Sequence, residues 1–319
     1  MSEAILGIDV SKKKLDVALM MDDKTMVKKF ENSPKGFALL HGWLRSLHID
    51  LVYACLESTG GYGEPIAEFL HGKGHHVSIV NPFRIKAFAN SDLQRNKTDP
   101  ADARTIADFC RVKRPKLWRP PSPEVKHLQV LTRRIESLEH MLTMEQNRLE
   151  TAGSDVRLSI QRIIETLKME IRSLEQLIKK HIDDHPDLKQ QRDLLESIPG
   201  IGRKTSQILL GELEFRQFSS ARAVAAHAGV TPRKDQSGTS LNRTRLSKLG
   251  NGRIRKALYF PALVAVKHNT IISSFARRLS RRGKTPKQVI CAAMRKLLHL
   301  AYGVLKTNRP FDSNLAIQA

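Results

Sequence analysis

The spacing of hydrophobic residues changes repeatedly along the first third of the chain. Between Ala4 and Val112, apolar and alternating runs typical of β-strands are interleaved with the three- and four-residue spacing of amphipathic helices. The strand-like runs are AILGIDVS, KLDVALMM, TMVKKFEN, LVYACLEST and HVSIVNP, and the helical patterns span residues 34–47, 63–71, 82–89 and 99–112. Three strands followed by alternating helices and strands predict an α/β domain whose sheet has an antiparallel edge and a parallel remainder.

Proline interrupts this pattern at residues 114–124, where RPKLWRPPSPE has four prolines in eleven residues. This composition predicts an extended linker and a domain boundary. Beyond it, two long apolar repeats flank TAGSD, which predicts an antiparallel coiled-coil helical hairpin over 125–186. Its seam residues are Leu128, Leu131, Ile135, Leu138, Leu142 and Leu149, then Ile160, Ile163, Leu167, Ile171, Leu174 and Ile178. Such a seam is buried internally or against another subunit, and we favour a subunit contact because a projecting hairpin alone is poorly packed.

The remainder of the chain, residues 187–319, is expected to be a mainly helical domain with loops at 198–202 and 231–241. The predicted organisation is therefore an α/β domain over 1–113, a linker over 114–124, the hairpin over 125–186 and this all-α domain.

The charge of the chain points to a polyanionic partner. Its 319 residues include 54 Lys and Arg against 32 Asp and Glu, a formal charge of +22. Between Thr231 and Arg309 there are 19 basic residues and one acid, Asp235. A short basic run is usually a solvated surface, but a run this long repels itself unless a partner neutralises it, so we expect this segment to lie on nucleic acid. Aromatic residues make up only 5%, so base stacking is not expected to dominate.

Cysteine usage and hydropathy indicate a cytoplasmic protein. Cys55, Cys110 and Cys291 are far apart in sequence, without the paired spacing of a zinc site or a disulfide framework. The chain has no signal-peptide pattern and no run of about 18 apolar residues, so no membrane association is expected. The expected location is therefore the cytoplasm.

Four carboxylates are candidates for a metal site. Asp9 lies on the first predicted strand and Glu57 ends the fourth, so a central first strand brings them to the same end of the sheet. Asp99 and Asp102 begin the last helix of the domain, with Asp99 at the N-cap and Pro100 in the first turn. Four converging carboxylates need cations among them, and their hard oxygen ligands suit Mg²⁺, or Mn²⁺ in its place.

Each acid also has an ordinary structural explanation. Asp9 can pair with a lysine of the following VSKKK, Glu57 can cap a turn, and the two aspartates can simply start a helix. Taken singly these readings are favoured, because structural acids far outnumber catalytic ones. The joint placement favours a site, since Asp9 and Glu57 occupy otherwise apolar strands where a carboxylate needs a partner.

A second motif, SIPGIGRKTSQILL, places Pro-Gly-Ile-Gly between two helical patterns, which predicts a helix-hairpin-helix element. Its amides lie at a helix N-terminus and can hold a phosphate. The candidate nucleic-acid-binding residues here are Gly200, Gly202, Lys204 and Thr205, beside the further cation Arg203. The alternative is a purely structural helix–helix turn.

A polar segment from residue 231 to 241 contains Ser237-Gly238 and is predicted to be a flexible loop. The surrounding cations can hold a scissile phosphate and stabilise charge that develops on attack by the serine hydroxyl. These cations are Arg233, Lys234, Arg243, Arg245 and Lys248. Ser-Gly alone is weak evidence, since most such serines are turn residues, and no Ser-His-Asp order surrounds it.

Five segments together resemble the DEDD insertion-sequence transposases, the bridge-RNA-guided serine recombinases. They are GIDVSKKKLDV, CLESTGGYGEP, RNKTDPADAR, LLESIPGIGRKT and AGVTPRKDQSGTSLNRTRLSKLGNGRIRKALYFPAL, in this order over almost the whole chain. The four acids of the family fall on Asp9, Glu57, Asp99 and Asp102, and its serine falls on Ser237. Family members vary after the serine, here residues 239–242, so details of that segment do not transfer.

The resemblance implies a RuvC-like, ribonuclease-H-type domain, a coiled-coil arm and a helical transposase domain whose serine is the nucleophile. It implies further that an element-encoded guide RNA pairs with target and donor DNA, and that the protein is a tetramer, a dimer of dimers. The acids of one subunit and the serine of another then form each site, and strand exchange passes through a four-way junction. Two rival functions stay open at this point: a hydrolytic junction resolvase in which water is the nucleophile, and a non-catalytic nucleic-acid-binding scaffold.

Overall fold

The structure of the protein is a computed structural model that describes residues 3–22, 24–58, 60–91, 99–237 and 241–313. At 99–100, 234–237 and 241–244 it describes the path of the chain but not the side chains. The chain divides into two compact units, Met1–Pro120 and Pro121–Ala319. Each unit is treated by itself below.

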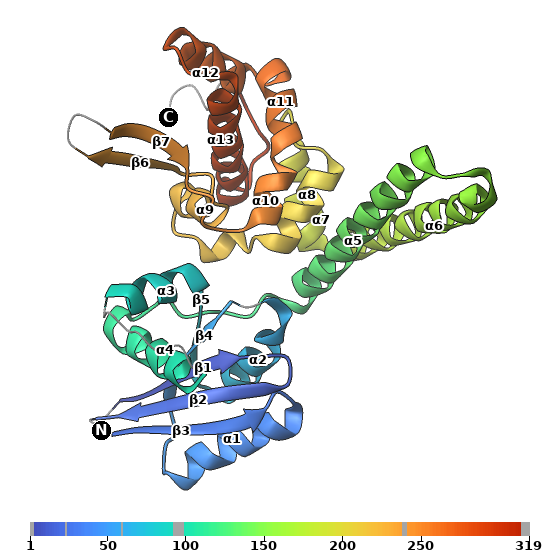
Figure 1. Ribbon diagram of the computed structural model, residues 1–319. Helices are drawn as coiled ribbons and strands as arrows, with labels where there is room; N and C mark the ends of the chain where they lie inside the picture. The colour runs from blue at the N-terminus through green and yellow to red at the C-terminus, as the bar shows by residue number, and fades with distance from the viewer. Residues whose placement is uncertain (1–2, 23, 59, 92–98, 238–240, 314–319) are drawn as a thin grey trace. The chain divides into compact units, whose positions relative to one another are not determined.

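The first unit is built on a five-stranded mixed sheet (Figure 1). Its strands are β1 (Ala4–Val10), β2 (Lys14–Met21), β3 (Lys24–Glu31), β4 (Val52–Glu57) and β5 (His76–Val80), in the spatial order β3-β2-β1-β4-β5. β1, β2 and β3 pair antiparallel, whereas β4 and β5 run parallel to β1. The predicted antiparallel edge and parallel remainder are confirmed.

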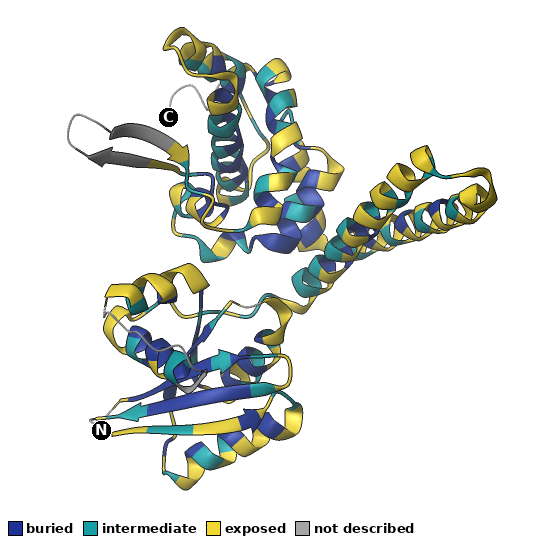
Figure 2. Ribbon diagram, in the orientation of Figure 1, coloured by how far each residue is buried: buried dark blue, intermediate teal, exposed yellow. Residues whose placement is uncertain are grey.

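Helices cover both faces of this sheet. α1 (Pro34–Ser46) and α2 (Glu64–Gly72) pack with the face that carries Leu6 and Ile8 of β1. α3 (Pro82–Ser91) and α4 (Asp99–Lys113) pack with the opposite face, which carries Ile5 of β1 and Cys55 of β4. Because side chains alternate along a strand, residues 5, 7 and 9 of β1 share the α4 face. Figure 2 shows β1 and β2 mostly buried between the two layers.

α4 lies directly on β1 at Gly7. A β-carbon built on Gly7 would be 2.2 Å from the Ala103 carbonyl oxygen and 2.4 Å from the Ala107 amide nitrogen. Only glycine therefore allows the backbone of α4 to approach this close. Helix α4 begins at Asp99. The sequence analysis placed Asp99 at the N-cap and so predicted the start of the helix one residue too far along the chain.

The proline-rich segment is extended, but its first part is attached to the first unit. Ser78 donates a hydrogen bond to the Pro115 carbonyl (3.1 Å), and the Trp118 amide donates to the Val77 carbonyl (2.7 Å). The boundary between the two units follows at Pro120, and α5 (Pro123–Thr151) begins after Ser122, whose side chain caps it. The first part of the segment therefore belongs to the sheet domain, and its last part belongs to the start of α5.

α5 and α6 (Ser154–Asp184) pack along one another as a helical hairpin (Figure 1). Only Ala152 and Gly153 separate the helices, because Ser154 and Asp155 of the predicted turn are already helical. In α6 the buried residues Ile164, Ile171 and Ile178 repeat every seven positions. Of the predicted seam residues, Ile171 and Ile178 are buried and Leu167 and Leu174 pack against the core, but Ile163 is 45% exposed and its neighbour Ile164 is buried instead. The buried seam residues of α5 between Leu128 and Leu138 share one apolar core with the C-terminal helices.

The rest of the second unit consists of helices and a short β-ribbon. The helices are α7 (Pro186–Glu196), α8 (Arg203–Glu212), α9 (Ala221–His227), α10 (Gly252–Ala257), α11 (Tyr259–His268), α12 (Thr270–Arg281) and α13 (Pro286–Thr307). Buried residues of α13 such as Leu297 and Leu298 lie at the centre of the core. Within the described residues, no helix is long and apolar enough to span a membrane.

The β-ribbon corrects the prediction of a flexible loop at 231–241. β6 (Pro232–Ser237) and β7 (Leu241–Leu246) pair antiparallel, with Arg233 opposite Arg245 and Ser237 opposite Leu241. Ser237 is therefore the last residue of a strand. The ribbon escaped the sequence reading because its strands are polar on both faces, so the apolar alternation that reveals a half-buried strand is missing.

Candidate active site

A row of acidic residues crosses three neighbouring strands of the sheet. β1 and β4 pair in parallel up to Ile8 and Leu56, so the next residues, Asp9 and Glu57, lie side by side. On the other side of β1, Asp9 pairs directly with Asp16 of β2. We call Glu57, Asp9 and Asp16 the acidic row. All three lie on the α4 face, since residues opposite one another in adjacent strands point to the same side of a sheet.

Asp16 was not among the acids chosen from the sequence. It is 1% exposed, the most deeply buried of the three, and lies within ion-pair distance of Lys14 and Lys29. A signal for it was present: in GIDVSKKKLD a two-residue turn at Lys12 and Lys13 pairs position 9 with position 16. The turn was overlooked because it lacks the glycine and asparagine that usually mark such hairpins.

The N-terminal end of α4 points to the same end of the sheet as the acidic row. Ala103 lies over Gly7, whereas Cys110, two turns later, donates a hydrogen bond to the Tyr53 carbonyl near the beginning of β4 (3.8 Å, sulfur donor). The helix therefore runs from the ends of β1 and β4 towards their beginnings. Asp102 immediately precedes Ala103, so the first turn of α4 brings it to the end of the sheet where Asp9 and Glu57 lie.

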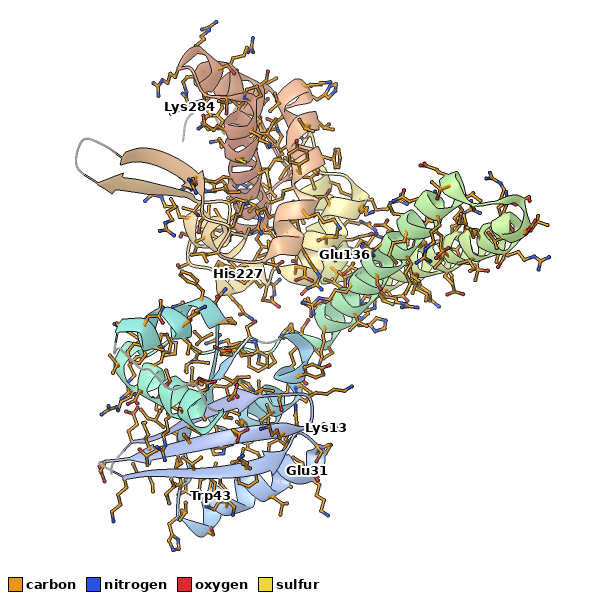
Figure 3. The ribbon with its side chains drawn as sticks, in the orientation of Figure 1. Lys13, Glu31, Trp43, Glu136, His227 and Lys284 are labelled. Carbon is orange, nitrogen blue, oxygen red and sulfur yellow. The ribbon has the colours of Figure 1, made fainter. Side chains whose placement is uncertain are left out.

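One side chain joins the loops that follow the two acidic strands. The Asn32 amide donates to the Ser11 carbonyl (2.8 Å), two residues after Asp9, and to the Tyr62 carbonyl (3.1 Å), in the loop after Glu57. Figure 3 labels Lys13 and Glu31, which mark this end of the sheet. These hydrogen bonds hold the two loops together and limit how the strand ends can move apart.

The donor set of this end of the sheet fits a hard divalent cation. The candidate ligands Asp9, Glu57, Asp99 and Asp102 supply only carboxylate oxygens, which Mg²⁺ and Mn²⁺ prefer. The Asp99 side chain lies outside the described residues. Among the side chains that are described, no group of three or more His, Cys, Asp or Glu is close enough to hold a metal ion. The described acids Asp9, Glu57 and Asp102 thus lie at one end of the sheet but do not form such a group by themselves.

The cysteine of β4, Cys55, is not a candidate for the nucleophile. Cys55, two residues before Glu57, and Cys110 of α4 are both buried between the sheet and α4. A hydrogen bond with Cys110, together with burial, raises the pKa of the Cys55 thiol, and a protonated thiol is a poor nucleophile and metal ligand. Ser237 stays the nucleophile predicted from the sequence, and its side chain lies outside the described residues.

Comparison with known proteins decides the family. A DEDD transposase model of the IS110 elements matches residues 6–152, and a model described as the IS116/IS110/IS902 transposase family matches residues 192–277. The pilin gene-inverting protein of Moraxella lacunata is 34% identical over 320 residues, covering 99% of both chains. The chain belongs to the IS110 family of transposases.

Other similar proteins agree with this assignment. The transposase of the insertion sequence IS1328 of Yersinia enterocolitica is 24% identical over 234 residues, 64% of this chain and 67% of that protein. An uncharacterized protein of the IS110 element of Streptomyces coelicolor is 26% identical over 145 residues, 45% of this chain and 35% of that protein. A Thermus thermophilus RuvC structure with a Holliday junction aligns with 36% of this chain and 99% of that chain, at 13% identity and a TM-score of 0.29, too low to carry an argument.

The second predicted contact of the IS110-family protein is the turn between α7 and α8. Gly200 has φ +109°, and a β-carbon there would be 2.7 Å from the Ala265 side chain, so α11 packs against this turn. Gly202 is exposed and precedes α8 without a side-chain cap, which leaves the helix N-terminus accessible. Lys204 forms an ion pair with Glu139 of α5 and Thr205 is buried. The phosphate contact stays a prediction, and the side chains of Lys204 and Thr205 also serve the packing of the unit.

The β-ribbon carries the third predicted contact. Arg233 and Arg245 lie opposite one another and are both exposed, so two like charges share one face of the ribbon. Lys248 is exposed beyond the ribbon, with φ +55°. The side chains of Lys234 and Arg243 are not described. Like charges directly opposite one another repel across a strand pair.

A further basic surface lies within the segment 231–309, which the sequence predicts to contact nucleic acid. The end of α12, the turn after it and the start of α13 expose six cations, and none of them makes an ion pair with an acid that the structure describes. We call them the basic patch: Arg277, Arg278, Arg281, Arg282, Lys284 and Lys287. Lys284 is labelled in Figure 3. The transposase model ends at residue 277, so most of this patch lies beyond the matched region.

Proposed function

We propose that this IS110-family protein cuts and rejoins DNA to insert and excise its mobile element, with Ser237 as nucleophile and the acids around Asp9 as the metal-binding group. The observation that carries the proposal is the placement of Asp9 and Glu57 side by side, with the first turn of α4 at the same end of the sheet. Carboxylates that lie side by side in a sheet repel one another. A function in binding cations explains why they are placed there.

The carboxylates are proposed to bind and orient, and the serine to react. Asp9, Glu57, Asp99 and Asp102 would hold Mg²⁺ or Mn²⁺, which when bound supplies positive charge to the reacting phosphate oxygens. Ser237 attacks the phosphorus of a DNA phosphodiester, a serine–phosphate bond forms, and the bond to the leaving sugar oxygen breaks. The energy of the phosphodiester is kept in the phosphoserine, so a free DNA hydroxyl can reverse the step on another strand.

The proposed partners are target DNA, donor DNA and an element-encoded guide RNA. A chain of formal charge +22, with exposed cations on the β-ribbon and the basic patch, favours contacts to phosphate backbones. Few aromatics are available for stacking, so reading of sequence is proposed to rest on base pairing with the RNA. One relative is named a pilin gene-inverting protein, so we propose that the same cleavage and rejoining can also invert a DNA segment.

The active assembly is proposed to be a tetramer, a dimer of dimers, in which acids and serine come from different subunits and strand exchange passes through a four-way junction. Exposed apolar residues on α6 support a subunit contact. Val156, Ile163 and Leu177 are each about half exposed and lie along one side of the helix at a seven-residue spacing, in which the position between Ile163 and Leu177 is the exposed Glu170. Figure 2 shows exposed positions along the whole hairpin.

The serine is tested with a labelled DNA substrate that contains the element ends, together with the transcript of the flanking non-coding DNA. Wild-type protein is expected to give a covalent protein–DNA adduct that survives denaturation, and recombinant product. Ser237→Ala is expected to give neither, whereas Ser240→Ala, in the same segment, retains both. Free 5′-phosphate ends without an adduct would instead establish hydrolysis by water.

The metal role is tested in the same assay. Asp102→Asn is expected to abolish strand cleavage in Mg²⁺ while nucleic-acid binding is retained. Asp108→Asn is the matched control, because Asp108 lies on the same helix and pairs with Arg111 at its far end. Cleavage by Asp102→Asn at the control rate would remove Asp102 from the mechanism, and cleavage without divalent metal would remove the metal.

A further inference from the structure

The second unit contains an open cavity that the mechanism above does not use. Its volume is about 690 Å³, within the range of about 300–1,000 Å³ that is common for ligand sites. Residues of α5, α6, α8, α10 and α11 line it, so it lies between the helical hairpin and the C-terminal helices. Glu136, labelled in Figure 3, is one of these residues. A cavity of this size has room for one nucleotide or for another ligand of that size.

Ion pairs hold the walls of the cavity together. Lys204 of α8 pairs with Glu139 of α5. Glu136, also of α5, pairs with two cations of α10, Arg253 at 3.0 Å and Lys256 at 3.2 Å. Residues of α5 and of the C-terminal helices also belong to one apolar core. Because these contacts are made within the protein itself, the cavity is formed before any ligand binds.

The lining carries more positive than negative charge. Seven of its residues are Lys or Arg and four are Glu, a difference of +3. Three of these cations, Arg172, Lys179 and Arg203, make no ion pair with an acid that the structure describes. Among the acids of the lining the same holds only for Glu175, so the charges left without an ion pair are three positive and one negative. This excess favours an anionic ligand.

A buried amide in the lining has its hydrogen-bonding groups free. Gln207 of α8 is 9% exposed, and its side chain makes no hydrogen bond to another residue in the described part of the chain. The amide atoms are not among the fully enclosed polar atoms that lack a partner, so they are open to the cavity. A glutamine amide has two donors and an acceptor, which is what the edge of a nucleobase requires.

An exposed aromatic ring completes the lining. Phe260 of α11 is 72% exposed, more than any other large apolar residue that the structure describes. Its ring meets the Tyr259 ring edge to face, with 5.5 Å between the centroids, so Tyr259 leaves at least one face of the Phe260 ring uncovered. Proteins that bind single strands combine such rings with basic groups, because a base stacks on the ring while the cations hold the backbone.

We propose that this cavity binds one unpaired nucleotide of the nucleic-acid partner, with its base on Phe260, its base edge at Gln207 and its phosphate at Arg203. Arg203 is the first residue of α8, whose N-terminus has no side-chain cap, so the amides of the first turn add to its charge. A paired base does not fit the site, because its edge is occupied by the opposite strand and its faces by its neighbours in the stack. The inference rests on the proposed function for the kind of partner.

The test compares two labelled 12-base-pair duplexes. One carries a single unpaired adenine at its centre, and in the other this nucleotide lacks its base. Both are made as DNA and as RNA, and binding is followed by fluorescence anisotropy in EDTA, from 50 to 250 mM salt. Wild-type protein is expected to bind the adenine probe at least fivefold more tightly than the abasic probe, in DNA, in RNA or in both, and the result identifies the source of the nucleotide. Equal affinity for the two probes in both nucleic acids would overturn the inference.

Phe260 is tested with a matched control on the same helix. Phe260→Ala is expected to remove the preference for the adenine probe and to leave the affinity for the abasic probe unchanged, whereas Phe260→Tyr keeps the ring and the preference. Val264→Ala is the control, since Val264 is 47% exposed one turn further along α11 and does not line the cavity. If Phe260→Ala changes the sedimentation of the protein but not the preference, the ring belongs to a subunit contact and the inference is overturned.

The two polar groups are tested separately. Gln207→Met keeps the length of the side chain but not its hydrogen-bonding groups, and is expected to reduce the preference for the adenine probe at least twofold. Arg203→Gln is expected to weaken both probes alike and to reduce the slope of log affinity against log salt by about 0.9, the change for one phosphate contact. An unchanged preference in the first variant, or an unchanged slope in the second, would reject this arrangement of the nucleotide.

These binding measurements do not require cleavage, so the two proposals fail separately. A wild-type protein that prefers the adenine probe but never cleaves DNA would reject the proposed function and keep the nucleotide site. Cleavage by a wild-type protein that shows no such preference would reject the nucleotide site alone.

Discussion

Gly7→Ala is expected to damage the active site through helix α4, without touching an acid. The new methyl carbon would lie 2.2 Å from the Ala103 carbonyl oxygen and 2.4 Å from the Ala107 amide nitrogen. Both atoms belong to the backbone, so no side chain can rotate away. The helix must move off the strand by about 1 Å to restore an ordinary contact, and overpacking of this kind costs about 1–3 kcal/mol.

The displacement acts on Asp102, because Asp102 is adjacent to Ala103 in the same helical turn. A misplacement of about 1 Å in a catalytic group can cost about 100-fold in rate. The assay compares the urea unfolding midpoint, DNA binding and single-turnover cleavage of Gly7→Ala with wild type. We expect a lower midpoint, unchanged binding and at least tenfold slower cleavage.

Gly42→Ala provides the control in the same unit. Gly42 is an exposed helical residue of α1, and a β-carbon there meets nothing within 4 Å. Alanine at this position is expected to stabilise the protein by about 0.5–1 kcal/mol and to leave cleavage unchanged. If Gly7→Ala matches wild type in both midpoint and cleavage, the close approach of α4 does not set the position of Asp102, and the reasoning is wrong.

Three further predictions concern other parts of the chain. Burial lowers the pKa of both His41 and His75, so below about pH 6.5 the unfolded chain binds protons that the folded chain does not. The melting temperature should therefore fall as the pH drops from 7.5 to 5.5. This fall should be smaller when both histidines are replaced by glutamine. Glu212→Ala should lower the free energy of unfolding in urea by about 3 kcal/mol, because it removes the buried carboxylate that binds Arg133 and Asn251. Asp50→Ala removes one partner of an exposed ion pair and should lower it by under about 1 kcal/mol. Lys284→Gln should reduce the salt slope of duplex binding by about 0.9, and an unchanged slope would exclude the basic patch from the DNA interface.

The sequence was sufficient for the elements of the first unit and for its connectivity. Buried strands and amphipathic helices differ in period, and the runs around Ala4 and Val52 are apolar enough to be unambiguous. The mixed sheet followed from their order, because a short hairpin connects antiparallel strands whereas parallel strands need a crossover. The family was also legible in the sequence, through five segments in the right order.

Where polarity hid the pattern, the sequence was insufficient. The β-ribbon that ends at Ser237 alternates between polar residues on both faces, so no apolar period distinguishes it from a loop. In α6, both Ile163 and Ile164 are apolar, and only packing against α5 decided that Ile164 is the buried one. A repeat with apolar residues in adjacent positions leaves the seam undetermined until a partner helix is present.

What the sequence alone determined is a basic chain that resembles the DEDD insertion-sequence transposases, with candidate acids at Asp9, Glu57, Asp99 and Asp102. Only the tertiary structure decided which acids are neighbours. Strand register put Glu57 beside Asp9 through the pairing of distant segments, whereas Asp16 reached the other side of Asp9 through the local hairpin at Lys12 and Lys13. The missing side chain of Gly7 then let α4 lie against β1, with its first turn at that same end of the sheet. The register between β1 and β4 and the approach of α4 are not local in the chain, so no local pattern of residues could establish them.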